Sequence, residues 1–363
     1  MRGIYTHHCC LARAENEKST TLPRGPKGTG RLWESRGSRV MNDNDHWKAE
    51  LKRAWRERFP GKRENIEISS KVVLRGRTQP KLHLSATGVS NNMQTNEAAF
   101  EGWLLALRAW CDIPGATLSW DRPRHDCGHY QRFLFRVAHF ERIIPWFEVD
   151  DNGELERATT VVASSLVINQ GGAESRRASD SNSEAALERA LLRWPGLPRA
   201  LGVELVDHQF PVGLFRGDVT NATQVFPAGK AAVDLVGWNE HDRRFVLVEL
   251  KKRGSEPIGA VSELFFYAML LQDVSNGRFG VGGERGARVR VGADHLQRAE
   301  VLDALWLAPG HHTLLADGRI VGLLNEACAI AGDVVRFGRY RLDDSLGEGR
   351  FAIQKLEPCP RSP

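Results

Sequence analysis

The 363-residue chain has few of the features that mark membrane, secreted or disulfide-rich proteins. No apolar run approaches the roughly 20 residues that a transmembrane helix needs, and the stretch FFYAMLL at 265–271 is far shorter. The first ten residues, MRGIYTHHCC, lack the hydrophobic core of a signal peptide. Six cysteines are scattered without a CxxC pair or a regular framework. These absences predict a protein that is not secreted and does not span a membrane, in a reduced, cytoplasmic setting.

The sequence also lacks a basic excess outside its first 40 residues. The formal net charge is +5, and residues 1–40 hold eight Lys or Arg against three acids. The remainder therefore carries 42 basic and 42 acidic side chains. A nucleic-acid surface on the body of the protein would be a local patch rather than a field over a whole domain. We predict that residues 1–40 form a disordered basic tail; a basic arm that contacts phosphates is the alternative.

Hydrophobic residues make up 41% of the chain, and its length is enough for two domains. The first, over 41–168, is predicted to be an α+β domain of unknown role. In the helix at 45–60, Trp47, Leu51 and Trp55 recur at four-residue spacing before Pro60 ends it. The predicted elements are helices over 45–60 and 96–111 and strands over 65–74, 80–86 and 129–149. Apolar and polar residues alternate over 129–149, which indicates strands or a hairpin there.

A small, polar, glycine-bearing segment at 169–182 is predicted to be a linker. The domain that follows, over 183–345, reads as an α/β domain with a mixed sheet flanked by helices, and 346–363 as a C-terminal tail. Its predicted elements are a helix over 183–194, a strand over 203–213, a hairpin of strands 231–238 and 244–252 joined by 239–243, a helix over 260–274, a strand over 304–311 and a helix over 319–332.

The hairpin carries three charged residues that suit metal-dependent phosphodiester cleavage: Asp234 on the first strand, and Glu249 and Lys251 on the second. Side chains alternate along a strand, so Glu249 and Lys251 share a face about 7 Å apart. Asp234 can reach the same side from the paired strand. Two carboxylates can hold a hard divalent cation, and the ammonium can orient water or balance charge on a phosphate. The alternative is an exposed acid–lysine pair at a strand end.

This pattern resembles the PD-(D/E)XK nuclease superfamily, close to its NucS-like branch, over about 183–335. The resemblance implies a restriction-endonuclease-like fold and a Mg²⁺ or Mn²⁺ cofactor. It implies that Asp234, Glu249 and the backbone carbonyl of Leu250 hold the metal. It also implies that Lys251 positions the attacking water or helps to deprotonate it. The proline that precedes the family aspartate is replaced by Val233.

Two flanking motifs extend the resemblance. SEAALERAL at 183–191 follows the family pattern S-E-x-x-L-E-x-x-L, which implies that Glu184 reaches the metal or its waters. Alternatively, Glu184 serves only the helix start, in a capping box with Ser181. The family pattern A-x-x-Q-L-x-x-Y is met from Ala260 to Tyr267, except that Glu263 replaces the glutamine. Glu263 then either contacts metal-bound water or weakens phosphate contact; the alternative is a solvated helix residue.

We therefore expect a metal-dependent endonuclease acting on DNA, with RNA as an alternative substrate. A catalytically inactive nuclease fold that binds nucleic acid or serves as a scaffold is the second hypothesis, and the carboxylate of Glu263 is the feature that raises it. The domain over 41–168 is expected to recognise substrate, to form a homodimer or to bind a protein partner. Phosphate contacts are expected from basic residues near the hairpin or in a later loop, unless these only form a solvated basic surface: Lys252, Arg253, Arg285, Arg288 and Arg290.

Overall fold

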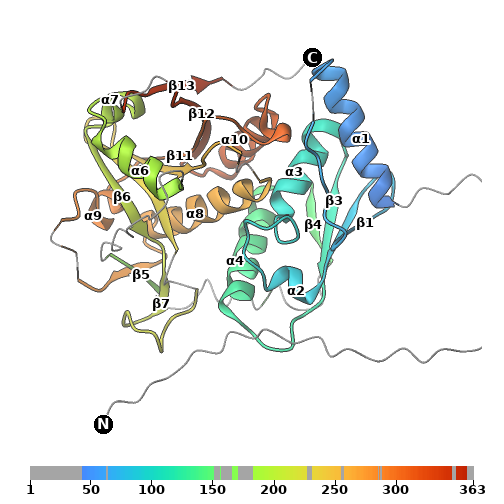
Figure 1. The fold of residues 1–363 in the computed structure, drawn as a ribbon. Helices are drawn as coiled ribbons and strands as arrows, with labels where there is room; N and C mark the ends of the chain where they lie inside the picture. The colour runs from blue at the N-terminus through green and yellow to red at the C-terminus, as the bar shows by residue number, and fades with distance from the viewer. Residues whose placement is uncertain are drawn as a thin grey trace, which may run out of the picture. The chain divides into compact units, whose positions relative to one another are not determined.

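The computed structural model describes residues 43–62, 64–150, 156, 166–170, 183–226, 231–254, 257–284, 286, 288–345 and 349–357 (Figure 1). The mixed α/β class predicted from the sequence is confirmed, since helices cover sheets that contain both parallel and antiparallel strands. The predicted basic tail at 1–40 lies outside the described residues, as does most of the predicted linker. Within the described part of the chain, no helix combines the length and the apolar character needed to cross a membrane.

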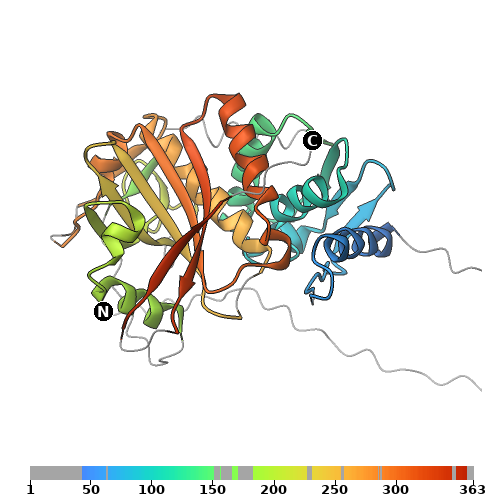
Figure 2. The same ribbon diagram turned by 90° about the horizontal axis from the view of Figure 1, so that it is seen from above.

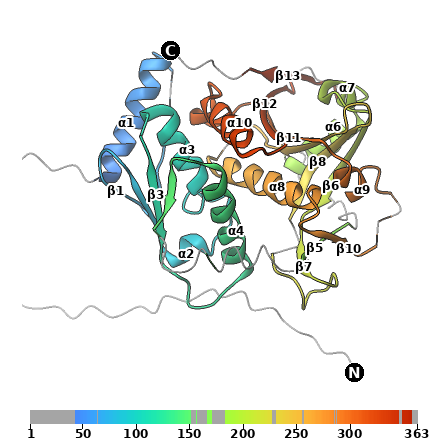
Figure 3. The same cartoon turned by 180° about the vertical axis from the view of Figure 1, so that it is seen from behind.

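The amino-terminal half contains a four-stranded sheet with helices packed beside it (Figure 3). Its strand order is β1-β2-β3-β4; β1 and β2 are antiparallel, and the other two pairs are parallel. The predicted helices at 45–60 and 96–111 are confirmed as α1 and α3, whereas the first two strands are shorter than predicted. The elements are α1 (Asp43–Arg58), β1 (Val72–Arg75), β2 (Lys81–Leu84), α2 (Ala86–Val89), α3 (Phe100–Cys111), β3 (Ala116–Trp120), α4 (Gly128–Ile143) and β4 (Phe147–Val149).

The prediction of strands over 129–149 is wrong for most of that stretch, which forms the helix α4. Several of the polar residues that created the alternating pattern are buried. Arg136 lies beside the carboxylate of Glu101, and His139 lies beside that of Asp273. Burial of polar groups needs such partners, which a pattern of apolar and polar letters cannot reveal. Only β4 at the end of the stretch is a strand.

The carboxyl-terminal half is built on a six-stranded mixed sheet of order β13-β12-β11-β9-β8-β6. β11 runs parallel to both β9 and β12, and the remaining neighbours are antiparallel. A three-stranded sheet of order β10-β5-β7 lies beside it (Figure 1). The strands are β5 (Leu166–Asn169), β6 (Leu205–Pro211), β7 (Leu214–Arg216), β8 (Ala232–Asn239), β9 (Arg244–Leu250), β10 (Gly280–Gly282), β11 (Val301–Ala308), β12 (Val335–Asp343) and β13 (Ala352–Leu356).

Helices cover both faces of the large sheet (Figure 2). The helices of this half are α6 (Glu184–Arg193), α7 (Leu197–Leu201), α8 (Gly259–Ser275), α9 (Ala293–Gln297) and α10 (Arg319–Ala331), with a 3₁₀ turn η1 (Thr313–Leu315). Leu191, Leu197 and Leu201 of α6 and α7 pack on one face, whereas α8 and α10 join the core on the other. The predicted helices and hairpin of this half are confirmed. The predicted tail at 346–363 is corrected in part, because β13 pairs with β12 as an edge strand.

The two halves share one hydrophobic core, and residues 41–363 form one compact unit. Buried side chains of α3 and α4 lie in the same cluster as those of α8 and α10. Buried Trp110 of α3 donates a hydrogen bond from its indole Nε1 to the main-chain oxygen of Leu314, 3.0 Å away. The predicted boundary at 169–182 therefore does not separate two independent cores.

Candidate active site

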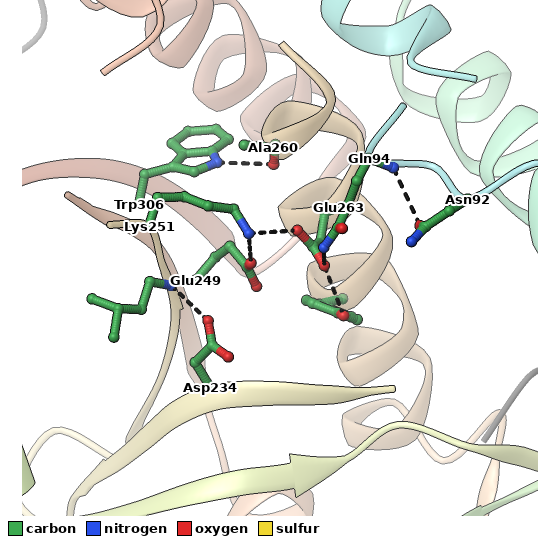
Figure 4. A network of polar contacts seen from close by, with 10 residues as sticks. Asn92, Gln94, Asp234, Glu249, Lys251, Ala260, Glu263 and Trp306 are labelled. Atoms are coloured by element: carbon green, nitrogen blue, oxygen red, sulfur yellow. Dashed lines mark hydrogen bonds and ion pairs between the residues drawn. The ribbon is translucent and has the colours of Figure 1, made fainter. Parts of the chain in front are cut away.

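The β8–β9 hairpin sets the positions of the predicted acids. The two strands are antiparallel, with Leu235 opposite Val248, and the same register continued by one residue places Asp234 opposite Glu249. Directly opposed residues share a face of the sheet. On the other side of β9, Trp306 of β11 lies opposite Glu249. Asp234, Glu249 and Trp306 thus form a row across the sheet on the face covered by α8 (Figure 4).

Asp234 lies where the hairpin ladder ends. Its Oδ2 accepts a hydrogen bond of 2.8 Å from the backbone N–H of Leu250. The side chain thus takes the place of the main-chain carbonyl that a neighbouring strand would offer to this N–H. Although the residue is partly exposed, its carboxyl group is desolvated by the surrounding protein. This desolvation raises the pKa of Asp234 to about 8, although the positive charge of Lys251 and the Leu250 N–H act to lower it. The surroundings therefore favour a neutral Asp234 unless a further positive charge is supplied.

Glu249 and Lys251 point the same way, as strand alternation requires, and form a buried ion pair. The Nζ of Lys251 donates a hydrogen bond of 2.5 Å to Oε1 of Glu249. The side chain of Glu249 is 3% exposed and that of Lys251 is 8% exposed. Burial raises the pKa of Glu249 well above its usual value, and the negative charges of Glu263 and Asp234 raise it further. Burial acts to lower the pKa of Lys251, but Glu249 and Glu263 outweigh it and raise that pKa. Lys251 is therefore an ammonium group at neutral pH.

Glu263 of α8 belongs to the same cluster and is not a solvated helix residue. It is buried, and its Oε2 accepts a hydrogen bond of 3.1 Å from the Nζ of Lys251. Its Oε1 accepts one from Tyr267 Oη at 3.1 Å and one from the side-chain amide of Gln94. Burial acts to raise the pKa of Glu263, yet the charge of Lys251 and the hydrogen bonds from Lys251 and Gln94 lower it. Gln94 was missed by sequence reasoning, since it lies 169 residues away along the chain.

The two acids of α6 act on different members of the cluster. Ser183 is the N-cap of α6 and accepts a hydrogen bond from the N–H of Ala186, so Glu184 is the first helical residue; Ser181 lies outside the described residues. The charge of Glu184 contributes to the raised pKa of Lys251. Glu188, one turn later, is buried and its charge contributes to the raised pKa of Asp234. The helix therefore brings both acids within electrostatic range.

Glu188 is held by a residue with an unusual backbone. The side-chain amide of Gln209 donates a hydrogen bond of 2.6 Å to its Oε2. Gln209 has a φ of 51°, and the β6–β8 pairing is interrupted there, at the position opposite Asp234. A left-handed conformation at a residue other than glycine costs energy. Sequence patterns gave no signal for this feature, because glutamine has no particular preference for that conformation.

The Leu250 side chain, Arg253 and Arg290 make their contacts elsewhere. The Leu250 side chain packs in the core on the opposite face, and Lys251 donates its backbone N–H to the Leu307 oxygen at 3.0 Å. Arg253 pairs with Asp344, at 2.9 Å. Arg290 donates its backbone N–H to Asp207, and Arg285 is outside the described residues.

A small pocket opens beside Glu249 and Lys251 and is lined in part by His311 and His312. His311 donates a hydrogen bond from Nε2 to the Tyr340 main-chain oxygen, 3.2 Å away. Burial lowers the pKa of both histidines to about 4. They therefore line the pocket as neutral rings at physiological pH.

The donor set can be compared with what a divalent cation requires. Among the described residues, no group of three or more His, Cys, Asp or Glu side chains is arranged to hold a metal ion. A closed protein cage of the zinc or calcium type is therefore not indicated there. Mg²⁺ is commonly bound by only one or two carboxylates, together with water and substrate phosphates. Asp234 and Glu249 meet that smaller requirement, and burial together with the negative charge of neighbouring acids raises the pKa values of both.

Comparisons of this chain with protein-family models, with curated proteins and with solved structures found no match.

Proposed function

We propose that this chain is a divalent-metal-dependent nuclease that hydrolyses phosphodiester bonds, with DNA as its substrate. The observation that carries the proposal is the convergence of Asp234, Glu249 and Lys251 at the open end of the β8–β9 hairpin. The mixed sheet, with α8 on one face and α6 on the other, supports the finer assignment of a restriction-endonuclease-like arrangement. Fold alone does not fix function, so the proposal depends on the side chains.

The chemistry assigns a role to each residue. Asp234 and Glu249 would hold Mg²⁺ or Mn²⁺, with the main-chain carbonyl of Leu250 as a further oxygen ligand. When bound, the cation would supply Lewis-acid activation of the phosphodiester and of the attacking water. Lys251, kept as an ammonium by Glu263, would orient that water or balance charge on the phosphate rather than remove a proton.

The charge of the cluster supports the choice of a cation. Asp234, Glu249 and Glu263 place three carboxyl groups around the single ammonium of Lys251. Burial and the charge of neighbouring acids raise the pKa values of Asp234 and Glu249, so the cluster retains protons unless another positive charge is supplied. A divalent ion would replace those protons.

The direct test is a cleavage panel on the full chain. Labelled single-stranded, duplex, mismatched and branched DNA and RNA are incubated with Mg²⁺ or Mn²⁺, and again with a chelator. Lys251→Ala is compared with Lys355→Ala, which removes an exposed lysine that pairs with Glu357. We expect the wild type and Lys355→Ala to cleave DNA, and Lys251→Ala and every chelated sample to be inactive. Metal-independent cleavage, or full activity of Lys251→Ala, would refute the assignment.

A nucleic-acid-binding protein without turnover is the second candidate. The observation in its favour is that Lys251 contacts both Glu249 and Glu263, so an ion would have to compete for Glu249. The same panel decides between the two. Tight binding of nucleic acid that a chelator does not change, with every substrate left intact, would support the binding protein.

A further inference from the structure

The segment that precedes α3 reaches the candidate active site from the amino-terminal half of the chain (Figure 4). The side-chain amide of Gln94 donates to Oε1 of Glu263, and Tyr267 donates to the same oxygen. The other oxygen of Glu263 accepts from the Nζ of Lys251, 3.1 Å away. One carboxylate therefore connects Gln94 to Lys251, and both of its oxygens are engaged.

Gln94 is held in place by backbone packing as well as by its side chain. Gly259, the first residue of α8, lies so close that a Cβ there would overlap the main-chain oxygen of Gln94. Within the segment, Asn92 Oδ1 accepts the N–H of Gln94 at 3.3 Å. Further along, the Trp103 indole donates to the Asn96 oxygen at 2.9 Å. The position of the amide is therefore set by the docking of 92–96 against α8.

A second contact fixes the same turn of α8 to α3. The hydroxyl of Ser262, the residue before Glu263, donates to Oε2 of Glu101 over 2.7 Å, and all three side chains are buried. Gly102 lies against Ile258, where a Cβ would meet both its side chain and its main-chain oxygen at 2.8 Å. The amino-terminal half thus contacts α8 at the turn that carries Glu263.

We propose that Gln94 is a positioning residue that fixes Glu263 and, through it, aims Lys251 at the reaction centre. The inference rests on the proposed nuclease function. It makes the amino-terminal half a part of the active site rather than a detachable recognition module. The lysine stem is flexible and its head is a compact point charge, so a second fixed acceptor is needed to define its place. Without Gln94, the Oε1 atom of Glu263 keeps only Tyr267 as a donor, so Glu263 can change rotamer and Lys251 then pairs with Glu249 alone.

The consequence is a loss of turnover with little loss of substrate binding, because Gln94 contacts Glu263 rather than the nucleic acid. We expect Gln94→Leu to lower kcat by about 10- to 100-fold, the size of effect that small misplacements of reacting groups produce. KM should stay within about twofold. Gln94→Glu, which keeps the size but removes the donor, should do the same. Gly259→Ala should reproduce the defect without altering Gln94, because it displaces the segment.

Asn91→Ala is the matched control, since the Asn91 side chain contacts Glu97 and none of the site residues. Mn²⁺ affinity, measured by calorimetry without substrate, provides a readout that is independent of cleavage. It should fall by about tenfold in Gln94→Leu, because a Lys251 released from Glu263 competes for Glu249, and a hydrogen bond to a charged group is worth about that factor or more. Asn91→Ala should leave kcat and Mn²⁺ affinity unchanged.

The possible results separate the two proposals. Cleavage by the wild type with an unchanged kcat and Mn²⁺ affinity in Gln94→Leu overturns the positioning role and leaves the nuclease function intact. If the wild type cleaves no substrate, the proposed nuclease function is refuted. The contact between Gln94 and Glu263 is then tested by urea unfolding of Gln94→Leu, Glu263→Leu and the double variant. Midpoint shifts that simply add would overturn the coupling of Gln94 to Glu263, and a smaller combined shift would support it.

Discussion

Two buried ionic clusters meet α8 at consecutive residues, and they differ in charge balance. The interface cluster, which joins the two halves of the chain, consists of Glu101, Arg136 and Ser262. The site cluster consists of Asp234, Glu249, Lys251 and Glu263. The first places one carboxylate against one guanidinium, whose Nε lies 3.2 Å from Glu101 Oε1, with the Ser262 hydroxyl on the other oxygen. The second places three carboxyl groups against one ammonium.

The difference separates a structural role from a functional one. Burial of charge is tolerated best when opposite charges balance, and the interface cluster sets one guanidinium against one carboxylate, although burial still raises the pKa of Glu101. The Arg136 guanidinium also lies over the Phe100 ring, 5.1 Å from its centroid. The site cluster is not balanced, because three carboxyl groups lie around one ammonium, and neighbouring acids add to burial in raising the pKa values of Asp234 and Glu249. A cluster with more acids than bases is suited to exchange bound protons for a cation.

The largest expected effect is on catalysis. Glu249→Gln should lower kcat by about 10³-fold or more, equivalent to about 4 kcal/mol of transition-state stabilisation, because it removes a proposed metal ligand. The free energy of unfolding of the metal-free protein should stay the same or rise, since a repelling carboxylate is neutralised. Glu101→Gln, at a temperature where it remains folded, should retain kcat within about twofold. Equal losses of kcat in both variants would erase the distinction between the clusters.

The next effect is on stability and belongs to the interface cluster. Arg136→Met should lower the free energy of unfolding by about 3–5 kcal/mol, because it leaves Glu101 buried without its partner. Urea unfolding measures the loss. Combining it with Glu101→Leu should recover most of the stability, since a well-packed apolar pair can replace a buried ion pair. A loss below about 1 kcal/mol for Arg136→Met would mean that the interface cluster contributes little.

A smaller effect should follow from adding the cation itself. Mg²⁺ or Mn²⁺ at about 100 times its Kd should raise the free energy of unfolding by about 2.7 kcal/mol, since only the folded chain forms the site. Asp234→Asn should abolish this gain, whereas Arg136→Met should keep it despite a lower starting stability. Thermal or urea unfolding at fixed ionic strength measures both. An equal gain in wild type and Asp234→Asn would place the ion elsewhere.

The sequence was sufficient to predict the hairpin and α8 because local rules govern them. Strand 244–250 is nearly all apolar until Glu249, and alternation then determines that Lys251 shares its face. The helix α8 follows as a long apolar run, which its central position explains. The acids of the site are therefore carried by elements whose type and facing follow from neighbouring residues.

Other features depend on partners far away in the chain, so no local pattern contains them. α4 was predicted as strands because Arg136 and His139 count as polar, although both are buried against acids from other elements. Gln94 gives no signal at all, since its role depends on a contact across 169 residues. The sequence leaves the role of Glu263 open, because that role depends on its hydrogen bonds with Lys251 and Gln94.

The smallest expected effect is the pH dependence of the metal-free protein. The pKa of Asp234 is about 8 in the folded chain and about 3.8 when unfolded, so between these values the folded state holds a proton that the unfolded state has lost. Stability should therefore fall as pH rises through this window, by at most about 1.4 kcal/mol per pH unit. Glu249, whose pKa is also raised, acts in the same direction.

Buried histidines oppose this trend at lower pH, which fixes the range in which it should be measured. The pKa values of His311 and His312 are about 4 in the folded chain, below their usual 6.5, so their contribution rises with pH up to about 6.5 and is then constant. His208, whose pKa is raised by Asp207, loses its contribution above that point and adds to the fall. Urea unfolding in chelator from pH 6.5 to 8 should thus show a decline that is smaller in Asp234→Asn. An identical slope in both proteins would show that Asp234 ionises normally, and the contrast between a balanced and an unbalanced cluster would then lose its physical basis.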